Sequence, residues 1–287
     1  MNHPTLTSSE FRRFQSFIYS NAGIHLSAQK NALLTSRLWR RLRALNLDRY
    51  GDYLDRVETS PDELVRMLDC ITTNETRFFR EPKQFEFLET VIAERMRRDA
   101  DEARRPAVAR VWSAGCSTGQ EPYSVAMSLR ASLGQGWEAH ILATDLSTRA
   151  LDVARAGIWP IAHAPQIPPR YLTTFMLRGH GSQAGQMKAG REIRSMLSFA
   201  RLNLNDAGYG MTERFDIILC RNVLIYFDAH SRRAVVERLV ERLLPGGILM
   251  VGHAESLHGV SAALRPLLPT IYELEPEGVM DARPGRR

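Results

Sequence analysis

Residues 108–133, VARVWSAGCSTGQEPYSVAMSLRASL, contain the pattern that decides the fold. An apolar run at 108–113 is typical of a short buried strand, and a helical pattern follows at 121–133. Between them lies the small-residue turn 114–119, where a ligand can approach the backbone and the free N–H groups at the helix start. The turn lacks the full GxGxxG spacing, so by itself it is also compatible with a tight structural corner.

A second apolar run at 139–144 ends in Asp145, 26 residues after Gly119. An acidic residue at this place can accept hydrogen bonds from both hydroxyls of a ribose, whereas the structural alternative for Asp145 is a helix N-cap. The turn and the acid together predict a cofactor that contains adenosine. NAD and S-adenosylmethionine both satisfy that prediction.

The strand and helix patterns continue to alternate along the rest of the chain. This alternation predicts an α/β fold with a doubly wound, Rossmann-like parallel sheet. A frayed tail is expected after Glu275. The remaining elements are a helix at 146–156 capped by Ser147, strands at 215–220, 248–251 and 270–274, a helix at 229–243 and a turn at 245–247.

The first 75 residues show no strand-like alternation, so we expect a small all-helical domain over 1–75. Helices are predicted to start at Ser9, Ser27 and Ser60, and Glu63 can complete a capping box with Ser60. A linker helix near 82–98 and a charged loop are expected within 76–105. The α/β domain is expected over 106–287.

Residues 158–195 interrupt the alternation with four prolines followed by four glycines. The segment is too long for an ordinary connection of about 2–6 residues in such folds. It predicts an inserted small antiparallel β-subdomain, which usually serves recognition; a loop without that role is the alternative.

Composition narrows the class of protein. The 287 residues are 44% hydrophobic and 24% charged, which is typical of a globular protein and excludes collagen-like and disordered chains. No apolar stretch reaches the ~18 residues needed to span a bilayer, and the first ten residues have no apolar core of a secretory signal. Three widely spaced cysteines without a CxxC pair argue against disulfides and zinc ribbons, and they fit a cytoplasmic location.

The net charge of +6 is concentrated in one segment. Residues 28–49 contain six basic residues and one acid, and helical spacing places four leucines on one side and the basic side chains on another. A solvated helix face is one interpretation; a docking surface for an acidic partner is the other. The basic face is predicted to consist of Lys30, Arg37, Arg40, Arg41 and Arg43.

Five motifs in a fixed order make the sequence resemble the CheR-type chemoreceptor glutamate methyltransferases. They are ITTNETRFFR at 71–80, STGQEPYS at 117–124, ATD at 143–145, CRNVLIYF at 220–227 and GHAES at 252–256. The resemblance implies a helical N-terminal domain, a methyltransferase sheet and a small β-subdomain. It also implies S-adenosylmethionine as cofactor, S-adenosylhomocysteine as product, and transfer of the methyl group to receptor glutamates.

The resemblance also implies roles for individual residues. Arg80 and Tyr226 are expected to position the acceptor near the transferred methyl group, with Asp145 on the ribose and Asn203–Leu204 near the adenine. One departure is Gln120, where many members of the family have glutamate. The full set of expected cofactor-binding residues is Asn74, Thr76, Arg80, Glu121, Asp145, Asn203, Leu204, Arg221 and Asn222.

The implied partner is the cytoplasmic, acidic helical region of a chemoreceptor, which the basic face would bind. Residues 178–185 resemble the loop that grips a receptor's C-terminal pentapeptide, with Arg178, Gly179, Gly181 and Gly185 as the expected contacts. The resemblance leads us to expect a monomer that neither inserts into a membrane nor binds nucleic acid.

Other functions remain open at this stage. The basic helix suits a nucleic-acid methyltransferase, although no NPPY-type motif is present. A non-catalytic binding module with the same fold is a further alternative. An NAD-dependent dehydrogenase is the least favoured, because the sequence shows no second mononucleotide-binding half. Cys116 and Cys220 are expected to be buried packing residues. His253 and Glu255 match an H-x-E signature without the PCxxC of zinc deaminases, so no metal site is expected.

Overall fold

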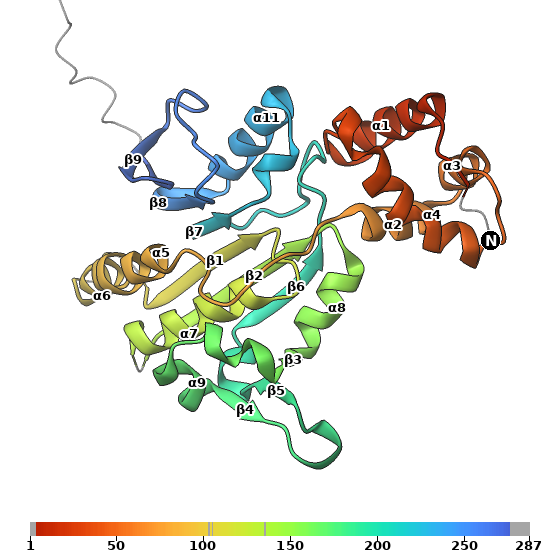
Figure 1. Cartoon of the computed structure of the whole chain (residues 1–287). Helices are drawn as coiled ribbons and strands as arrows, with labels where there is room; N and C mark the ends of the chain where they lie inside the picture. The colour runs from red at the N-terminus through yellow and green to blue at the C-terminus, as the bar shows by residue number, and fades with distance from the viewer. Residues whose placement is uncertain (1–3, 103, 105, 135, 276–287) are drawn as a thin grey trace, which may run out of the picture.

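The computed structural model describes residues 4–102, 104, 106–134 and 136–275, so the expected C-terminal tail lies outside the described residues. A helical region lies beside one edge of a central sheet, and a small antiparallel sheet projects from the sheet's helical layer (Figure 1). Among the described residues, no helix is long and apolar enough to cross a membrane.

The helical region begins with a reciprocal cap. The Thr7 hydroxyl accepts a hydrogen bond from Glu10 N at 3.2 Å, and the Glu10 carboxylate accepts one from Thr7 N at 3.0 Å, so the first helix starts one residue before the expected Ser9. Apolar residues from every helix form one core in this region. The elements are α1 (Ser8–Ala22), η1 (Ala28–Lys30), α2 (Asn31–Ala44), α3 (Tyr50–Glu58) and α4 (Pro61–Ile71).

The start of α4 departs from the expected capping box. Ser60 accepts a hydrogen bond from Glu63 N at 3.3 Å, as predicted, but the Glu63 carboxylate does not return to the cap. It accepts hydrogen bonds from Arg41 Nε at 2.8 Å, Arg41 Nη2 at 2.7 Å and the Tyr53 hydroxyl at 3.0 Å. A charge-assisted, two-pronged bond to arginine is stronger than a cap, which explains why the prediction for Glu63 was wrong.

The expected linker helix is present and slightly longer than predicted. It runs from Pro82 to Asp101 through a central π-helical turn and packs against the helix that follows the glycine turn. Its three segments are α5 (Pro82–Phe87), η2 (Leu88–Ile92) and α6 (Ala93–Asp101).

The central sheet has the strand order β6-β2-β1-β7-β8-β10-β9, and its first five strands are parallel. This confirms the predicted doubly wound class, because each parallel pair is joined by a crossover. The strands are β1 (Val108–Ala114), β2 (Glu138–Asp145), β6 (Leu197–Arg201), β7 (Phe215–Cys220), β8 (Leu243–Val251), β9 (Leu264–Leu268) and β10 (Ile271–Leu274). The helices are α7 (Gln120–Leu133), α8 (Thr148–Ala156), η5 (Leu224–Tyr226) and α11 (Ala229–Val240).

Alternate residues of each strand pack into two different cores. Val111 and Ile217 join α7 and the linker helix, whereas Trp112 and Ile218 join α11 on the other face. Both faces are buried, as strands in a parallel sheet require. The two cysteines of these strand ends, Cys116 and Cys220, are buried, and burial raises the pKa of both thiols well above the ordinary value.

Two expectations near the C-terminus were wrong. The helix ends at Val240, and residues 245–247 lie inside β8 instead of forming a separate turn. Leu243 pairs with Phe215 and Ile248 with Ile217, so the extra residues of β8 bulge out while the pairing continues on either side. Strand β9, which follows no recognisable alternation, was not predicted.

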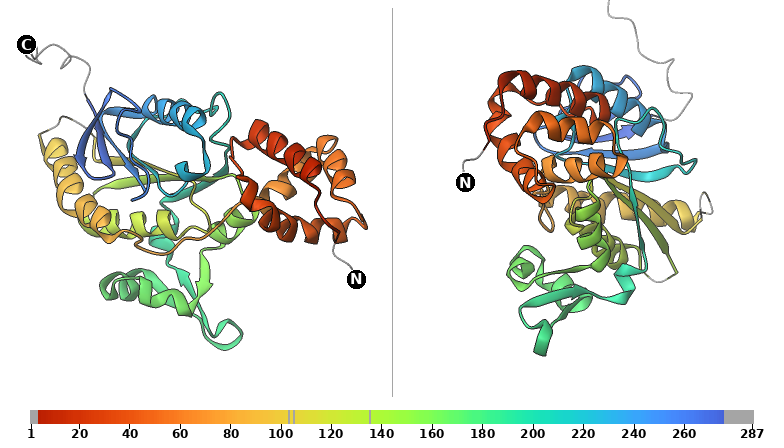
Figure 2. Two further views of the ribbon diagram at one scale, coloured as in Figure 1. Left: turned by 45° about the horizontal axis from the view of Figure 1, so that its top comes forward. Right: turned by 90° about the vertical axis from the view of Figure 1, so that its right-hand side faces the viewer.

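The segment 158–195 forms a three-stranded antiparallel sheet of order β3-β5-β4. Trp159 anchors it, because its ring packs edge-on against Tyr123 of α7 and against Phe78. The hairpin between β4 and β5 extends away from the rest of the molecule (Figure 2). Its elements are β3 (Ile158–Pro160), η3 (Ile161–Gln166), α9 (Pro169–Phe175), β4 (Met176–Arg178), η4 (Gly181–Gln183), β5 (Gln186–Ala189) and α10 (Arg191–Arg194).

The helical region is tied to the edge of the central sheet where the parallel strands end. His25 N donates a hydrogen bond to Tyr226 O at 2.8 Å, and Ile24 forms a β-bridge with Phe227. On the other side, the Thr148 hydroxyl of α8 donates to Asp69 of α4 at 2.6 Å. The helical region therefore covers the edge at which doubly wound sheets bind their ligands.

Candidate functional site

A pocket lies between the helical region and the carboxyl ends of β1, β2 and β7. All ten residues predicted to be catalytic or cofactor-binding line it. Six segments far apart in the sequence meet there: part of 22–37, part of 71–80, the glycine turn with the start of α7, the end of β2, residues 202–204 after β6 and the loop after β7. The predicted residues among the lining are Asn74, Thr76, Arg80, Glu121, Asp145, Asn203, Leu204, Arg221, Asn222 and Tyr226.

The glycine turn after β1 is constrained by its neighbours. Gly115 has φ +91°, and an added Cβ would lie 2.4 Å from Val223 Cγ2. Gly119 has φ +95°, and its Cβ would lie 2.9 Å from the Cβ of Ala154. Both positions therefore require glycine. The turn brings backbone close to the pocket, as a cofactor with a bulky polar group needs.

Asp145 is held in place at the end of β2. Its carboxylate accepts hydrogen bonds from Ser117 N at 2.7 Å and from Ser147 N at 2.8 Å. Burial raises the pKa of Asp145, against the opposing effect of these backbone donors. The N-cap of α8 is Ser147, whose hydroxyl accepts a hydrogen bond from Ala150 N at 3.2 Å. Asp145 is therefore not the N-cap of this helix, which was the alternative interpretation of its position.

A buried guanidinium joins three segments beneath the pocket. Arg221 donates to Glu121 Oε2 at 3.0 Å and to Glu81 Oε2 at 3.1 Å, and it also donates to the carbonyl of Arg80. Its side chain is 1% exposed, and its Nε has no hydrogen-bond partner among the described residues. The Ser113 hydroxyl donates to the other oxygen of Glu121 at 2.7 Å.

The two carboxylates of this cluster differ in their protonation behaviour. Burial acts to raise the pKa of both. For Glu81, the attraction of Arg221 and the hydrogen bond from His253 N outweigh burial, and the pKa falls below the ordinary value. For Glu121, burial prevails over Arg221 and the pKa is raised. The cluster carries one positive and two negative groups, which favours a cationic ligand nearby.

Arg80 and Tyr226, the two residues predicted to position the acceptor, both line the pocket. Arg80 is half-buried and donates weakly to Glu75 O at 3.4 Å, and no carboxylate among the described residues forms an ion pair with it. Tyr226 is also half-buried; its carbonyl is held by His25, and Lys30 Nζ lies 5.8 Å from its ring centroid. The Arg80 guanidinium is thus available to an incoming anion.

The remaining predicted cofactor residues are fixed through their backbones or amides. The Ser117 hydroxyl donates to Asn74 O at 3.1 Å, which joins the 72–77 stretch to the glycine turn. Asn203 Nδ2 donates to Asn21 O of α1 at 2.7 Å, and Leu204 is buried against the α11 core. Phe78 and Phe79 are buried, as expected of packing residues beside this junction.

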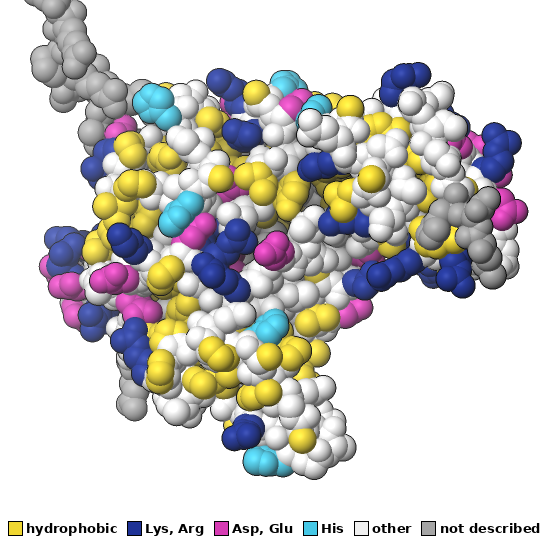
Figure 3. All heavy atoms as spheres, in the orientation of Figure 1, with side chains coloured by type: hydrophobic (Ala, Val, Ile, Leu, Met, Phe, Trp, Pro, Cys, Tyr) yellow, Lys and Arg dark blue, Asp and Glu magenta, His cyan; other side chains and the backbone are white. Residues whose placement is uncertain are grey.

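The basic face differs from its prediction. Only Arg40 and Arg43 of the five basic residues are exposed, whereas Arg41 pairs inward with Glu63. Arg37 donates to the carbonyl of Ile71 and to Thr73, and both Arg37 and Lys30 line the pocket. Helical periodicity assigned these side chains to one solvent face, but long side chains reach partners beyond their own helix. Lysine and arginine side chains are visible around the helical region in Figure 3.

The four residues expected to bind a receptor tail lie apart from the pocket, at the β4–β5 hairpin. Gly181 and Gly185 have positive φ, and an added Cβ at Gly179 would lie 2.0 Å from Gln183 O. The hairpin itself therefore requires its glycines. Arg178 is exposed at the end of β4, which is an edge strand with no further partner in its described sheet.

Two buried acids at the site were not among the predicted residues. Glu81 directly follows the first motif, and its place next to Arg80 in the sequence could have indicated that it belongs to the site. Glu255 lies in the GHAES motif at 252–256 but was given no role of its own, and its carboxylate accepts three backbone hydrogen bonds. Among the described residues, no group of three or more His, Cys, Asp or Glu side chains is placed to hold a metal ion.

Comparison with known proteins identifies the family. The model of the CheR methyltransferase SAM-binding domain matches residues 74–271, and that of the CheR methyltransferase all-alpha domain matches residues 9–72. The chain belongs to the CheR methyltransferase family. It is therefore an S-adenosylmethionine-dependent methyltransferase, which decides between the adenosine cofactors left open by the sequence pattern.

Named relatives match over most of their length. Chemotaxis protein methyltransferase 2 of Pseudomonas aeruginosa is 36% identical over 93% of this chain and 93% of its own. The chemotaxis protein methyltransferase of Salmonella typhimurium is 36% identical over 94% of this chain and 91% of its own, and that of Escherichia coli is 37% identical over 94% and 92%.

Proposed function

We propose that this CheR methyltransferase transfers the methyl group of S-adenosylmethionine to glutamate carboxylates on the cytoplasmic helices of chemoreceptors. The observation that carries the proposal is one pocket that combines a constrained glycine turn, an oriented acid at Asp145 and a guanidinium at Arg80 without an acidic partner among the described residues. The relatives are named as chemotaxis methyltransferases, which supports this class of substrate.

The residues present suit S-adenosylmethionine. Gly115 and Ser117 of the glycine turn line the pocket, and the Asp145 carboxylate is aimed by two N–H donors and can accept from a ribose. The Arg221 cluster has an excess negative charge that suits a sulfonium and an α-amino group. When bound, the cofactor supplies a methyl group on a positively charged sulfur.

The protein's own residues have a limited chemical task in this reaction. A glutamate has a reference pKa near ~4.3, so the acceptor is already an anion at pH 7 and needs no general base. Arg80 would orient that anion, and Tyr226 would pack beside it. Alignment of the reacting groups can contribute ~7–11 kcal/mol, which makes positioning the main contribution.

Labelled S-adenosylmethionine and receptor cytoplasmic fragments provide the test. We expect label on the receptor that alkali releases as methanol, as a methyl ester requires. Asp145→Ala should reduce cofactor affinity more than 100-fold, whereas Asp152→Ala, the same change at an exposed position of α8, should leave it unchanged. Alkali-stable label, or wild-type affinity in the Asp145 variant, would contradict the proposal.

We further propose that the β4 edge and the Arg178 side chain bind a receptor's C-terminal pentapeptide. An exposed edge strand can pair with an extended peptide, and an arginine can meet its carboxylate. Arg178→Ala should slow methylation of a full-length receptor but not of one lacking the tail, and Arg191→Ala should slow neither. Equal rates on the two receptors with the wild-type protein would refute this role.

We also propose that the protein acts as a cytoplasmic monomer and does not bind nucleic acid. Residues of a single chain complete the pocket, and two of the five predicted basic residues line it instead of facing outward. Light scattering should give the mass of one chain, and added DNA or RNA should not change it. A dimer mass would overturn the monomer proposal.

A further inference from the structure

Glu255 lies in the turn after β8, and its side chain is almost completely buried. Its Oε2 accepts hydrogen bonds from Asn222 N and Gly252 N, both at 2.7 Å, and its Oε1 accepts one from Ile225 N at 3.1 Å. A single carboxylate therefore joins the end of β8 to the loop after β7. That loop supplies Asn222 and Tyr226 to the pocket.

The backbone that Glu255 holds is unusual. Asn222 has φ +60°, in the left-handed region that favours glycine and that asparagine adopts more readily than most other residues. The space around it is tight, because a Cβ added at Gly252 would lie 2.4 Å from Asn222 Nδ2 and 2.8 Å from Glu255 Oε2. The hydrogen bond from Asn222 N to Glu255 is thus one of the restraints that keep this conformation.

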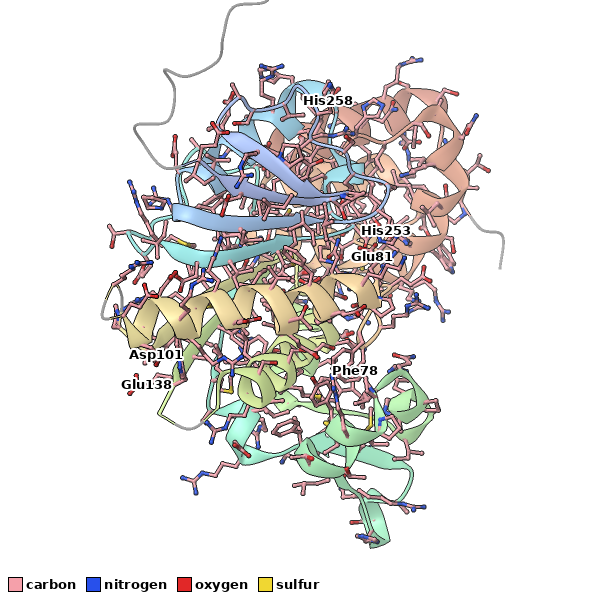
Figure 4. All side chains as sticks on the ribbon, turned by 90° about the vertical axis from the view of Figure 1, so that its left-hand side faces the viewer. Phe78, Glu81, Asp101, Glu138, His253 and His258 are labelled. Carbon is pink, nitrogen blue, oxygen red and sulfur yellow. The ribbon has the colours of Figure 1, made fainter. Side chains whose placement is uncertain are left out.

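Glu81 holds the preceding residue from the opposite side. Its carboxylate accepts from Arg221 Nη2 and from His253 N, each at 3.1 Å. Glu81 and His253 lie next to each other where α5 begins, as Figure 4 shows. Glu81 itself has φ +61°, which also lies in the left-handed region.

The two carboxylates therefore act on adjacent residues through the same turn. Glu81 fixes the side chain of Arg221, Glu255 fixes the backbone of Asn222, and both are bonded to residues of the 252–255 turn. Neither acid is among the residues that line the pocket. Their effect on a ligand must consequently pass through Arg221 and Asn222.

We propose that Glu255 and Glu81 are positioning residues that set the conformation of Arg221 and Asn222 and thereby the affinity for S-adenosylmethionine. The proposal rests on the proposed role of Arg221 and Asn222 at the cofactor. Glu255 also accepts a hydrogen bond from Ile225 N, next to Tyr226, so the KM for the receptor is measured alongside the affinity for the cofactor.

The test uses the full chain with Glu255→Gln, which keeps the shape of the side chain but replaces an acceptor by a donor. We expect the Kd for S-adenosylhomocysteine, measured by calorimetry, and the KM for S-adenosylmethionine to rise about 10-fold. A 10-fold rise corresponds to about 1.4 kcal/mol. The KM for the receptor should rise less than the KM for S-adenosylmethionine, because only one of the three hydrogen bonds of Glu255 is next to Tyr226.

Glu273→Gln is the matched control. Glu273 is also a buried carboxylate and is paired with Arg95 and Arg265, but it lies on β10, outside the pocket lining. This variant should lose thermal stability and keep its affinity for S-adenosylhomocysteine. An equal loss of affinity for S-adenosylhomocysteine in both variants would mean that Glu255 acts only through the stability of the fold, and would overturn the proposal.

Wild-type affinity in a folded Glu255→Gln variant would also overturn it. If that variant does not fold, Glu81→Gln takes its place. We expect the same rise in the Kd for S-adenosylhomocysteine, and wild-type affinity in a folded Glu81→Gln variant would overturn the proposal. A wild-type chain that binds no S-adenosylhomocysteine would refute the proposed function itself, which separates the two failures.

Discussion

Two arginines of this protein are held by buried acids, and their surroundings differ. Arg41 in the helical region donates hydrogen bonds from Nε and Nη2 to the Glu63 carboxylate, which also accepts one from the Tyr53 hydroxyl. Arg221 at the pocket divides its donors between Glu81 and Glu121 and leaves Nε without a partner among the described residues. The first arrangement is satisfied within the helical bundle, and the second carries excess negative charge beside a ligand pocket.

The difference teaches how to separate a structural ion pair from a functional one. Burial and ion pairing are common to both arginines, so neither property by itself indicates function. What distinguishes Arg221 is that its partners come from two other segments of the chain that meet beside the pocket, and that the pKa values of its two acids are shifted in opposite directions.

The largest effect should come from Arg221→Met, which leaves two buried carboxylates without their cation. We expect methylation to fall more than 100-fold and the free energy of unfolding to fall by about 3–5 kcal/mol. Methylation assays and urea denaturation measure the two quantities. Retention of most of the activity would show that Arg221 is as structural as Arg41.

Arg41→Met should affect stability alone. Removing the partner of Glu63 should lower the free energy of unfolding by about 1.5–3 kcal/mol, while the Kd for S-adenosylhomocysteine stays within two-fold. Denaturation and calorimetry on the same preparation provide the comparison. A large loss of cofactor affinity would erase the distinction between the two arginines.

Acid should weaken the helical region through Glu63. Burial tends to raise the pKa of Glu63, but hydrogen bonds from Arg41 and Tyr53 outweigh it and the net pKa is lowered. A lowered pKa stabilises the fold above the unfolded value of about 4.3, and this contribution is lost as the pH falls through the folded value. The stability difference between wild type and Glu63→Gln should therefore be largest above about pH 5 and should shrink as the pH falls through the lowered pKa of Glu63. A difference that does not depend on pH would contradict this.

The smallest effect is expected at the exposed end of the basic face. The double variant Arg40→Glu, Arg43→Glu should raise the KM for a receptor fragment about 3–10-fold, mainly through slower association, and added salt should reduce the difference. Stability and cofactor affinity should not change. An unchanged receptor KM at low salt would assign receptor binding to other residues.

Local sequence patterns predicted most of the architecture. The parallel sheet followed from apolar runs between helical patterns, and the glycine turn and Asp145 followed from their places at strand ends. The patterns failed where pairing across the sheet decided the outcome, as in the bulge at residues 245–247 and in strand β9. They also failed for Glu63, because a capping motif contains no information about an arginine on another helix.

The sequence by itself determined the fold class, the family and the residues that come together at the pocket, because periodicity and motifs record local backbone preferences and ligand contacts. The three-dimensional packing was needed to show which charged side chains face outward, which pair inside, and that Glu81 and Glu255 hold Arg221 and Asn222 at the pocket. These contacts join positions far apart in the chain, such as Arg221 and Glu81, which are 140 residues apart. Long side chains choose their partners by distance and burial, and neither quantity can be read from local spacing.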